Sequence, residues 1–347
     1  MIYLKTEDEI ELLRENNILV SRTLAEVGRH CKPGVTTREL NDLAEAYMRS
    51  HGATPACLGY EGYPAATCIS VNEQVVHGIP SDYVIKEGDI VSVDFCTFMK
   101  GFVGDSAYTF AVGEVGDDVK RLLDVTKEAL YRGTAQAKAG NRIGDISAAV
   151  QEYAESFGYG VVRELEGHGI GRRMHEQPGV PNYGARGRGP LLKEGMVICI
   201  EPMITMGNRA VVFERDGWTV RTRDRKPAAH YEFAVAIRKN GPDVLTDFSI
   251  IEFVDFNEAY TLGIAPAAAA EAKPKTRRSR SKKASTDAVE DATVVVAEGE
   301  TAAAPKKEKA TPKAKSAASK APKAPKAAAA KASAPKVAKK TNVGKKM

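Results

Sequence analysis

Four carboxylates lie on apolar stretches that read as buried strands. Asp94 ends the segment IVSVD and Glu201 ends VICIE, while Asp105 and Glu232 each stand on the apolar segment that follows. A carboxylate in a buried strand is costly unless a proton or a cation compensates its charge. Taken singly, each acid could be an ordinary strand-end residue. Because no matching cluster of Lys or Arg accompanies the set, we predict a site for two divalent ions bridged by carboxylates.

The acids belong to an internal duplication. KEGDIVSVD at 86–94 is repeated as KEGMVICIE at 193–201, and each copy follows a His-Gly-Ile tripeptide, which begins at His77 or at His168. Each half reads as helix, His-Gly-Ile, strand with acid, strand with acid. This predicts a pseudo-two-fold domain with a site between its halves, and two independent βα units are the weaker alternative. Symmetry alone would make both histidines ligands.

Asp94 and Asp105 are expected on the two arms of one hairpin. Their numbers centre the turn at Met99–Lys100, so the two carboxylates should face each other directly, with Cβ atoms about 5 Å apart. Ionised carboxylates at that distance repel, and a cation between them would relieve the repulsion. Oxygen ligands with one imidazole favour Mn²⁺, Fe²⁺ or Co²⁺, with Zn²⁺ as a further candidate.

The composition changes near residue 260. Residues 261–347 hold 21 Lys and Arg against 7 Asp and Glu, which leaves 29 basic and 38 acidic residues in 1–260. The second part is dominated by Ala, Lys, Pro and Ser. It cannot bury enough apolar surface to offset its conformational entropy, so we predict a disordered basic tail. The first part is long enough for one large core.

The first 260 residues predict an α+β domain, because helix pairs alternate with antiparallel hairpins. Thr6 and Glu9 form a capping box that should start the first helix. Further helices are expected at 37–50, 117–138 and 144–157. The hairpin strands are expected near 89–98 and 102–112, joined at Lys100-Gly101, and a second hairpin should turn at Gly217-Trp218.

Compartment and membrane contact follow from what the chain lacks. It has no run of eighteen apolar residues, which predicts no membrane span, and its acidic N-terminus lacks the pattern of a signal peptide. The cysteines are odd in number and form no C-x-x-C pair, so we expect a reducing, cytoplasmic environment. They are Cys31, Cys57, Cys68, Cys96 and Cys199.

Five stretches of residues 1–252 are specific in combination, namely GYEGYPAATCISVNEQVVHGIP, DFCTFMKGFVGDSAYTFAVG, GHGIGRRMHEQPGV, IEPM and DGWTVRTRDRKPAAHYE. Together they resemble the type I methionine aminopeptidases. The resemblance implies the pseudo-two-fold pita-bread fold, two divalent metal ions, and removal of the initiator methionine from nascent chains with a small second residue. A monomer is expected.

The resemblance also implies a role for each site residue. It makes His77 a substrate contact rather than a ligand and pairs it in that role with His175. One of these two histidines, His175 or His77, would stabilise the developing oxyanion, and Glu201 would carry out the proton transfers. The five implied metal ligands are Asp94, Asp105, His168, Glu201 and Glu232. The implied methionine pocket comprises Cys57, Tyr60, Tyr63, Cys68, Met174 and Trp218. Judged without the resemblance, the aromatic residues among these could equally be core residues.

Four positions depart from the family pattern, namely Glu61, Cys96, Met174 and Phe233. None of them removes an implied ligand. Two other functions share the fold. One is an X-Pro peptidase of the aminopeptidase P or prolidase kind, and the other is a non-catalytic relative that binds RNA or ribosomes. The basic tail could tether the enzyme to ribosomal RNA through phosphate contacts, or could only keep it soluble, and we weigh these two equally.

Overall fold

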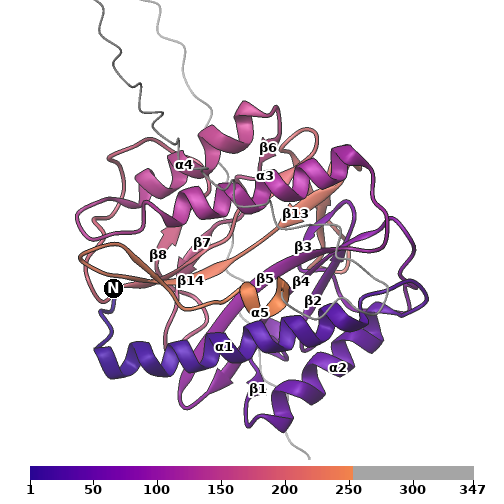
Figure 1. Cartoon of the computed structure of the whole chain (residues 1–347), viewed down its shortest axis with the longest axis horizontal. Coiled ribbons are helices and arrows are strands. Elements are labelled where there is room, and N and C mark those ends of the chain that lie inside the picture. Colours follow the sequence, from indigo (N-terminus) through magenta and orange to yellow (C-terminus); the bar gives the residue numbers. More distant parts are fainter. Residues whose placement is uncertain (253–347) are drawn as a thin grey trace, which may run out of the picture. The chain divides into compact units, whose positions relative to one another are not determined.

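The computed structural model describes residues 1–252. The predicted domain boundary at 260 and the predicted disordered tail, 261–347, lie outside the described residues. In the view of Figure 1, one pair of long helices lies on each side of the strands, which confirms the α+β prediction. The helices are α1 (Glu7–His30), α2 (Thr37–Ser50), α3 (Asp117–Thr134), α4 (Ile143–Ser156) and the short α5 (Ser249–Glu252).

Two larger sheets carry the four acids. In the first, β4 pairs with three neighbours, and in the second the order is β15-β14-β9-β7-β8. The strands of the first are β1 (Thr54–Pro55), β2 (Cys68–Val71), β4 (Ile90–Met99) and β5 (Phe102–Ala111). Those of the second are β7 (Gly167–Gly169), β8 (Glu176–Val180), β9 (Val197–Ile200), β14 (Phe233–Ile237) and β15 (Pro242–Val244).

Two three-stranded sheets complete the fold, in the orders β13-β10-β6 and β11-β12-β3. Their strands are β3 (Gln74–Val76), β6 (Gly160–Val161), β10 (Met203–Thr205), β11 (Val211–Phe213), β12 (Val220–Thr222) and β13 (Ala228–His230). The chain turns between β11 and β12 through Gly217, as predicted. In the two larger sheets, α1 packs on β4 and β5 while α3 packs on β9 and β14, so the halves repeat one arrangement.

Local sequence signals set the helix starts. Thr6 accepts a hydrogen bond from the backbone N–H of Glu9 at 3.3 Å, and the Glu9 carboxylate accepts one from the N–H of Thr6 at 3.0 Å. This confirms the predicted capping box, which satisfies two of the N–H groups that a helix start leaves unpaired. Thr36 and Glu39 form the same box at the start of α2.

The hairpin of β4 and β5 has a different register from the prediction. Cys96, not Asp94, lies opposite Asp105, and Asp94 lies opposite Ala107. The reason is the turn, in which Lys100 and Gly101 both have positive φ, 52° and 83°. A two-residue turn of this kind matches the twist of the strands and moves the hairpin centre one residue further. Asp94 and Asp105 are therefore diagonal neighbours on one face, and the prediction that they face each other directly is wrong.

The two halves meet along β5. The Glu232 N–H donates to the carbonyl oxygen of Ala107 at 3.0 Å, and the Ser106 hydroxyl donates to the carbonyl oxygen of Glu232 at 2.7 Å. The Thr109 hydroxyl bonds in the same way to His230, at 2.7 Å. These bonds fix the backbone around Glu232 against the strand that carries Asp105, so acids from the two halves are brought to one seam.

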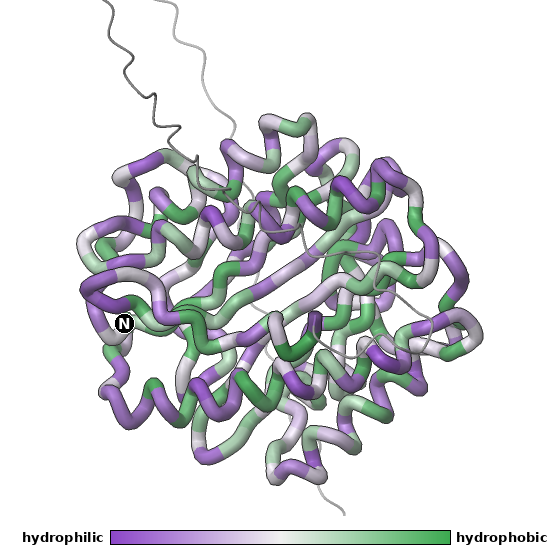
Figure 2. The backbone as a smooth tube through the Cα atoms, viewed as in Figure 1, coloured by the Kyte–Doolittle hydropathy of each residue, from purple (hydrophilic) through white to green (hydrophobic). Residues whose placement is uncertain are grey.

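The apolar residues follow the buried strands and the inner sides of the helices (Figure 2). Tyr108, Phe110 and Tyr231 are among the largest side chains that are fully buried, and the Tyr108 ring lies 4.9 Å from that of Phe110 and 5.0 Å from that of Tyr231 between centroids. Within residues 1–252, none of the helices combines the length and the apolar character that crossing a membrane would require.

Candidate metal centre

The four acids and His168 converge where the two larger sheets meet. His168 Nε2 lies 3.7 Å from Asp105 Oδ2 and 3.6 Å from Glu201 Oε1. Asp94 and Glu232 line the same cavity as these three residues. Two of the acids come from the β4–β5 hairpin, and the other two follow β9 and precede β14. Each half of the duplication therefore supplies two acids, as the repeat predicted.

The orientation of His168 is set by the backbone. Its Nδ1 lies 3.0 Å from the carbonyl oxygen of Gly169. A carbonyl oxygen can only accept, so Nδ1 carries the proton and Nε2 presents a lone pair. Burial lowers the pKa of His168 to about 4. The ring is thus neutral at neutral pH, and its free nitrogen faces the carboxylates as a metal ligand would.

The carboxylates resist ionisation without a cation. Burial raises the pKa of Asp105 to about 8. It also raises the pKa of Asp94, Glu201 and Glu232 well above the ordinary range, and repulsion from Asp105 adds to the effect in each case. A divalent ion at this place would be attracted by the same carboxylates and would take the place of their protons.

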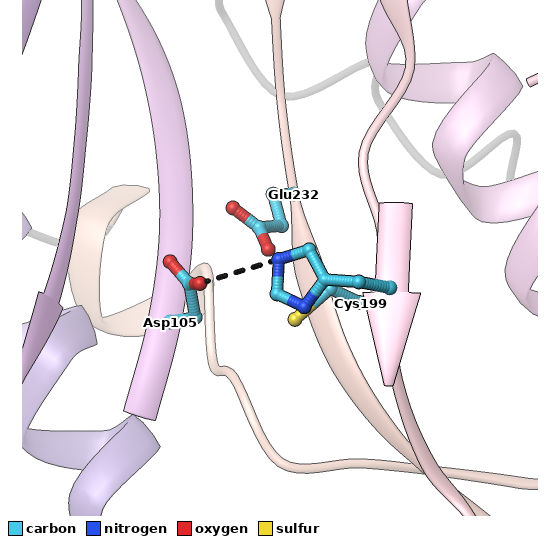
Figure 3. A group of neighbouring side chains, drawn as sticks. Asp105, Cys199 and Glu232 are labelled. Carbon is cyan, nitrogen blue, oxygen red and sulfur yellow. Dashed lines mark ion pairs between the residues drawn. The ribbon is translucent and has the colours of Figure 1, made fainter. Parts of the chain in front are cut away.

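Unpartnered buried oxygens support the fit to a metal. Asp105 Oδ1 and Glu232 Oε1 are buried and accept no hydrogen bond from any residue in 1–252. Asp105, His168, Cys199 and Glu232 each offer a ligand atom, and these four atoms lie within 4.8 Å of one another. Figure 3 shows Asp105, Cys199 and Glu232 pointing toward one another. Acid oxygens with one imidazole are the donors expected for Mn²⁺, Fe²⁺, Co²⁺ or Zn²⁺.

A cavity of about 310 Å³ opens onto these acids. Every site residue named from the sequence lines it. Those outside the acids and His168 are Cys57, Tyr60, Tyr63, Cys68, His77, Met174, His175 and Trp218. The structure thus brings together the predicted metal ligands and the predicted pocket residues, which lie up to 175 residues apart in the sequence. The aromatic residues that could have been core side chains form a cavity wall.

One side of the cavity carries polar donors. The Tyr60 hydroxyl lies 2.7 Å from Nδ1 of His175, and the rings of His168 and His175 are 4.4 Å apart between centroids. Burial lowers the pKa of His175. A neutral His175 that accepts at Nδ1 keeps an N–H at Nε2, which is available to a bound carbonyl group.

His77 lies elsewhere in the cavity than symmetry with His168 suggested. No ion pair within residues 1–252 joins His77 to a carboxylate. Its ring lies 6.3 Å from that of Trp218, which in turn lies 5.0 Å from Tyr63. Burial lowers the pKa of His77, and its φ of 58° is unusual for a residue with a side chain. Residues held in such sparsely populated backbone conformations are common at functional sites.

Two residues near the acids were not predicted. Cys199 precedes Glu201 by two residues, and His230 precedes Glu232 by two. His230 is buried, neither ring nitrogen has a hydrogen-bond partner in the described part of the chain, and Nε2 lies 3.9 Å from Glu201 Oε2. The two-residue period of a strand places such neighbours on the same face as the acid, and this signal could have found both.

Comparison with known proteins agrees with this site. The model of metallopeptidase family M24 matches residues 11–237. A methionine aminopeptidase of Clostridium acetobutylicum is 51% identical over 247 residues, which cover 71% of this chain and 99% of that protein. Methionine aminopeptidase 1 of Bacillus subtilis is 47% identical over 246 residues, with the same coverage.

Solved structures give the same result. The crystal structure of methionine aminopeptidase from Rickettsia prowazekii matches with a TM-score of 0.70 at 42% identity, covering 71% of this chain and all of that one. The prolidase from Pyrococcus furiosus matches with a TM-score of 0.59 at 26% identity, covering 70% of this chain and 65% of that one. The pita-bread fold that the sequence resemblance implied is therefore confirmed.

Proposed function

Because the chain belongs to metallopeptidase family M24, we propose that it removes the N-terminal methionine from polypeptides whose second residue is small. The observation that carries the proposal is that one cavity contains both parts of the site. It joins the set of acids and His168 to a pocket walled by Tyr60, Tyr63, Met174 and Trp218. An exopeptidase that removes an apolar first residue needs the metal ligands and the pocket for that side chain next to each other, because the bond it cleaves lies only one residue from the chain end.

The proposed ligands are five side chains that converge on the seam. They are Asp94, Asp105, His168, Glu201 and Glu232. We infer two divalent ions, drawn from Mn²⁺, Fe²⁺, Co²⁺ and Zn²⁺. When bound, such ions lower the pKa of a water molecule and polarise a carbonyl group.

The protein residues divide the proton transfers. Glu201 is the proposed base, which takes a proton from the attacking water and passes it to the leaving amine. His175 is held by Tyr60, so its Nε2–H can stabilise the negative charge that develops on the scissile carbonyl oxygen. His77 is the proposed second contact to the peptide, beside Trp218. The methionine side chain would pack between the aromatic rings and the thiols of Cys57 and Cys68.

The test measures release of the N-terminal residue from two substrates, Met-Ala-Ser and an X-Pro peptide. We expect release from the first, none from the second, and loss of activity after exhaustive chelation. Asp94→Ala and Glu201→Ala should each reduce turnover more than tenfold, a loss of at least about 1.4 kcal/mol. Glu164→Ala is the matched control, because Glu164 is exposed and does not line the cavity. Activity that survives chelation would refute the metal mechanism.

The two alternative functions are less favoured. Prolidase is the more distant relative, at 26% identity and 65% coverage of its own chain. A non-catalytic relative would be expected to lack ligands, whereas all five implied ligands line this cavity. Cleavage of an X-Pro peptide faster than of Met-Ala-Ser would support prolidase. No hydrolysis of either by the metal-loaded protein would support a binding protein.

We further propose nascent polypeptides in the cytoplasm as the substrates and a monomer as the working form. The basic composition of residues 261–347 suits an electrostatic tether to ribosomal RNA. Such binding would weaken steeply with salt, because it depends on counterion release from phosphates.

A further inference from the structure

Three free cysteines gather at one wall of the cavity. Cys57, Cys68 and Cys96 all line it, and none is in a disulfide. The backbone N–H of Cys96 donates to Cys57 Sγ at 3.2 Å. Cys57 and Cys68 are each 7% exposed, so a molecule as small as a peroxide can reach them through the cavity. The proposed mechanism uses none of these thiols in its chemical steps.

The backbone places Cys57 and Cys68 side by side. The chain runs along β4 until the N–H of Ala56 donates to the carbonyl oxygen of Cys96 at 2.8 Å, and it then leaves the strand. It returns to the same edge of β4 with Cys68 opposite Asp94. The points of departure and return are thus only two residues apart on β4. Cys57 and Cys68 stand at the two ends of the loop between them, and both line the cavity.

That loop forms part of the methionine pocket. Tyr60, Glu61 and Tyr63 all lie on it and line the cavity. Tyr63 is held by hydrogen bonds from its hydroxyl to the carbonyl oxygens of Thr67 and Gly78, at 3.1 and 3.0 Å. A covalent bond across the base of the loop would therefore act directly on the pocket wall.

We propose that Cys57 and Cys68 are a modification site, at which a peroxide converts the two thiols into a disulfide across the base of the pocket loop. Cys96 is the less suitable partner, because it lies within β4, directly opposite Asp105. Cys68 itself lies opposite Asp94, but it stands with Cys57 at the two ends of the loop, whereas Cys96 lies on β4 outside the loop.

The reaction balances in two steps. The Cys57 sulfur attacks one peroxide oxygen, the O–O bond breaks, and Cys57 becomes a sulfenic acid with release of one water. The Cys68 sulfur then attacks the Cys57 sulfur, the S–O bond breaks, and a second water leaves. Two thiols and one hydrogen peroxide thus give one disulfide and two waters. A thiol reductant reverses the change by disulfide exchange.

The consequence for activity rests on the proposed function. The disulfide draws both sulfurs out of the pocket wall that would contact the methionine side chain and fixes the loop that carries Tyr60. We expect methionine release to fall by about tenfold after oxidation and to recover on reduction. The formation of the bond does not depend on that function, so the two claims are tested separately.

The experiment uses the full-length protein loaded with Zn²⁺, because Zn²⁺ has no redox chemistry of its own. The protein is treated with hydrogen peroxide, free thiols are alkylated, and proteolytic fragments are mapped by mass spectrometry. The rate of methionine release is measured before treatment, after it, and after dithiothreitol. Each variant is compared with its own untreated rate. The variants are Cys57→Ser, Cys68→Ser, Cys96→Ser and, as the control away from the cavity, Cys31→Ser.

We expect a fragment that links Cys57 to Cys68 in the wild type, in Cys96→Ser and in Cys31→Ser. The two pair variants should lack it and should lose the dithiothreitol-reversible part of the inactivation. A link from Cys57 to Cys96, or sulfinic acid on Cys57 with no link, would overturn the proposal. If the link forms and the rate is unchanged, the modification site stands and the pocket assignment is wrong.

Discussion

The metal-free protein is expected to lose stability as the pH rises from about 6.5 to about 8. Burial raises the pKa of Asp105 from an ordinary 3.8 to about 8. A carboxyl group with a raised pKa binds its proton more tightly in the folded state, so its stabilising effect is lost as the pH rises toward that value. Each pH unit corresponds to about 1.4 kcal/mol. Asp105 alone therefore removes about 2 kcal/mol over this interval.

The interval is chosen to limit the contribution of the buried histidines. Burial lowers the pKa of His168 to about 4 and that of His230 to about 3. Below about pH 6.5 these rings gain protons mainly in the unfolded state, so their effect on stability has the opposite sign. Above it they are neutral in the folded state and lose their remaining protons in the unfolded state, which adds back at most about 0.4 kcal/mol of stability per ring. Asp94, Glu201 and Glu232 have raised pKa values and act in the same direction as Asp105.

Thermal unfolding of the chelator-treated protein measures the effect. A loss of about 2 kcal/mol in a domain of this size lowers Tm by roughly 4–8 °C. Added Mn²⁺ should raise Tm more at the higher pH, because fewer protons compete for the ligands. Asp105→Asn should flatten the metal-free pH dependence. A Tm of the metal-free protein that stays constant or rises over the interval would refute the conclusion that burial and mutual repulsion raise the pKa values of these acids.

Three further outcomes are expected. The protein should keep its own initiator methionine, because Ile2 is large and β-branched, and intact-mass measurement would detect a chain that begins at Ile2. A chain ending at Ala259 should turn over a short peptide at the full rate but lose salt-sensitive pelleting with ribosomes, and equal pelleting would contradict the tether. Lys5→Met should destabilise the fold by about 3–5 kcal/mol in urea unfolding, because its 2.8 Å partner is a buried carboxylate. Lys100→Met, at an exposed ion pair, should cost under about 1 kcal/mol.

The duplication made most of the fold predictable, because it repeats polar as well as apolar residues. The helices and the acid-bearing strands were located within a few residues, since apolar period and capping boxes are local signals. The hairpin register was not. Centring the turn on Asp94 and Asp105 assumed that the acids face each other, whereas the positive φ of Lys100 and Gly101 sets the pairing. Turn geometry outweighed a preference inferred from function.

Cys199 and His230 show a second limit of sequence reasoning. His230 lies outside the repeated nonapeptide, and Cys199 takes the place of Ser92 within it, so the duplication did not mark either as a ligand. Each reaches the acids because the seam along β5 brings strands from both halves together, through bonds such as that from Thr109 to His230. Contacts across such a seam depend on how two sheets pack. Sequence periodicity places Cys199 and His230 on the same strand face as the acids, but it does not show how close they come to an acid from the other sheet.

The two histidines of the repeat have different surroundings because their neighbouring strands differ. His168 lies in β7, which pairs with β9, and β9 leads into Glu201. His77 follows β3, which pairs with β12 of the β11–β12 hairpin, and the adjacent Trp218 lies against its ring. That hairpin has no counterpart in the first half. The duplication therefore builds the symmetric set of acids, and the added hairpin gives His77 its place beside the pocket, where a peptide rather than a metal ion would meet it.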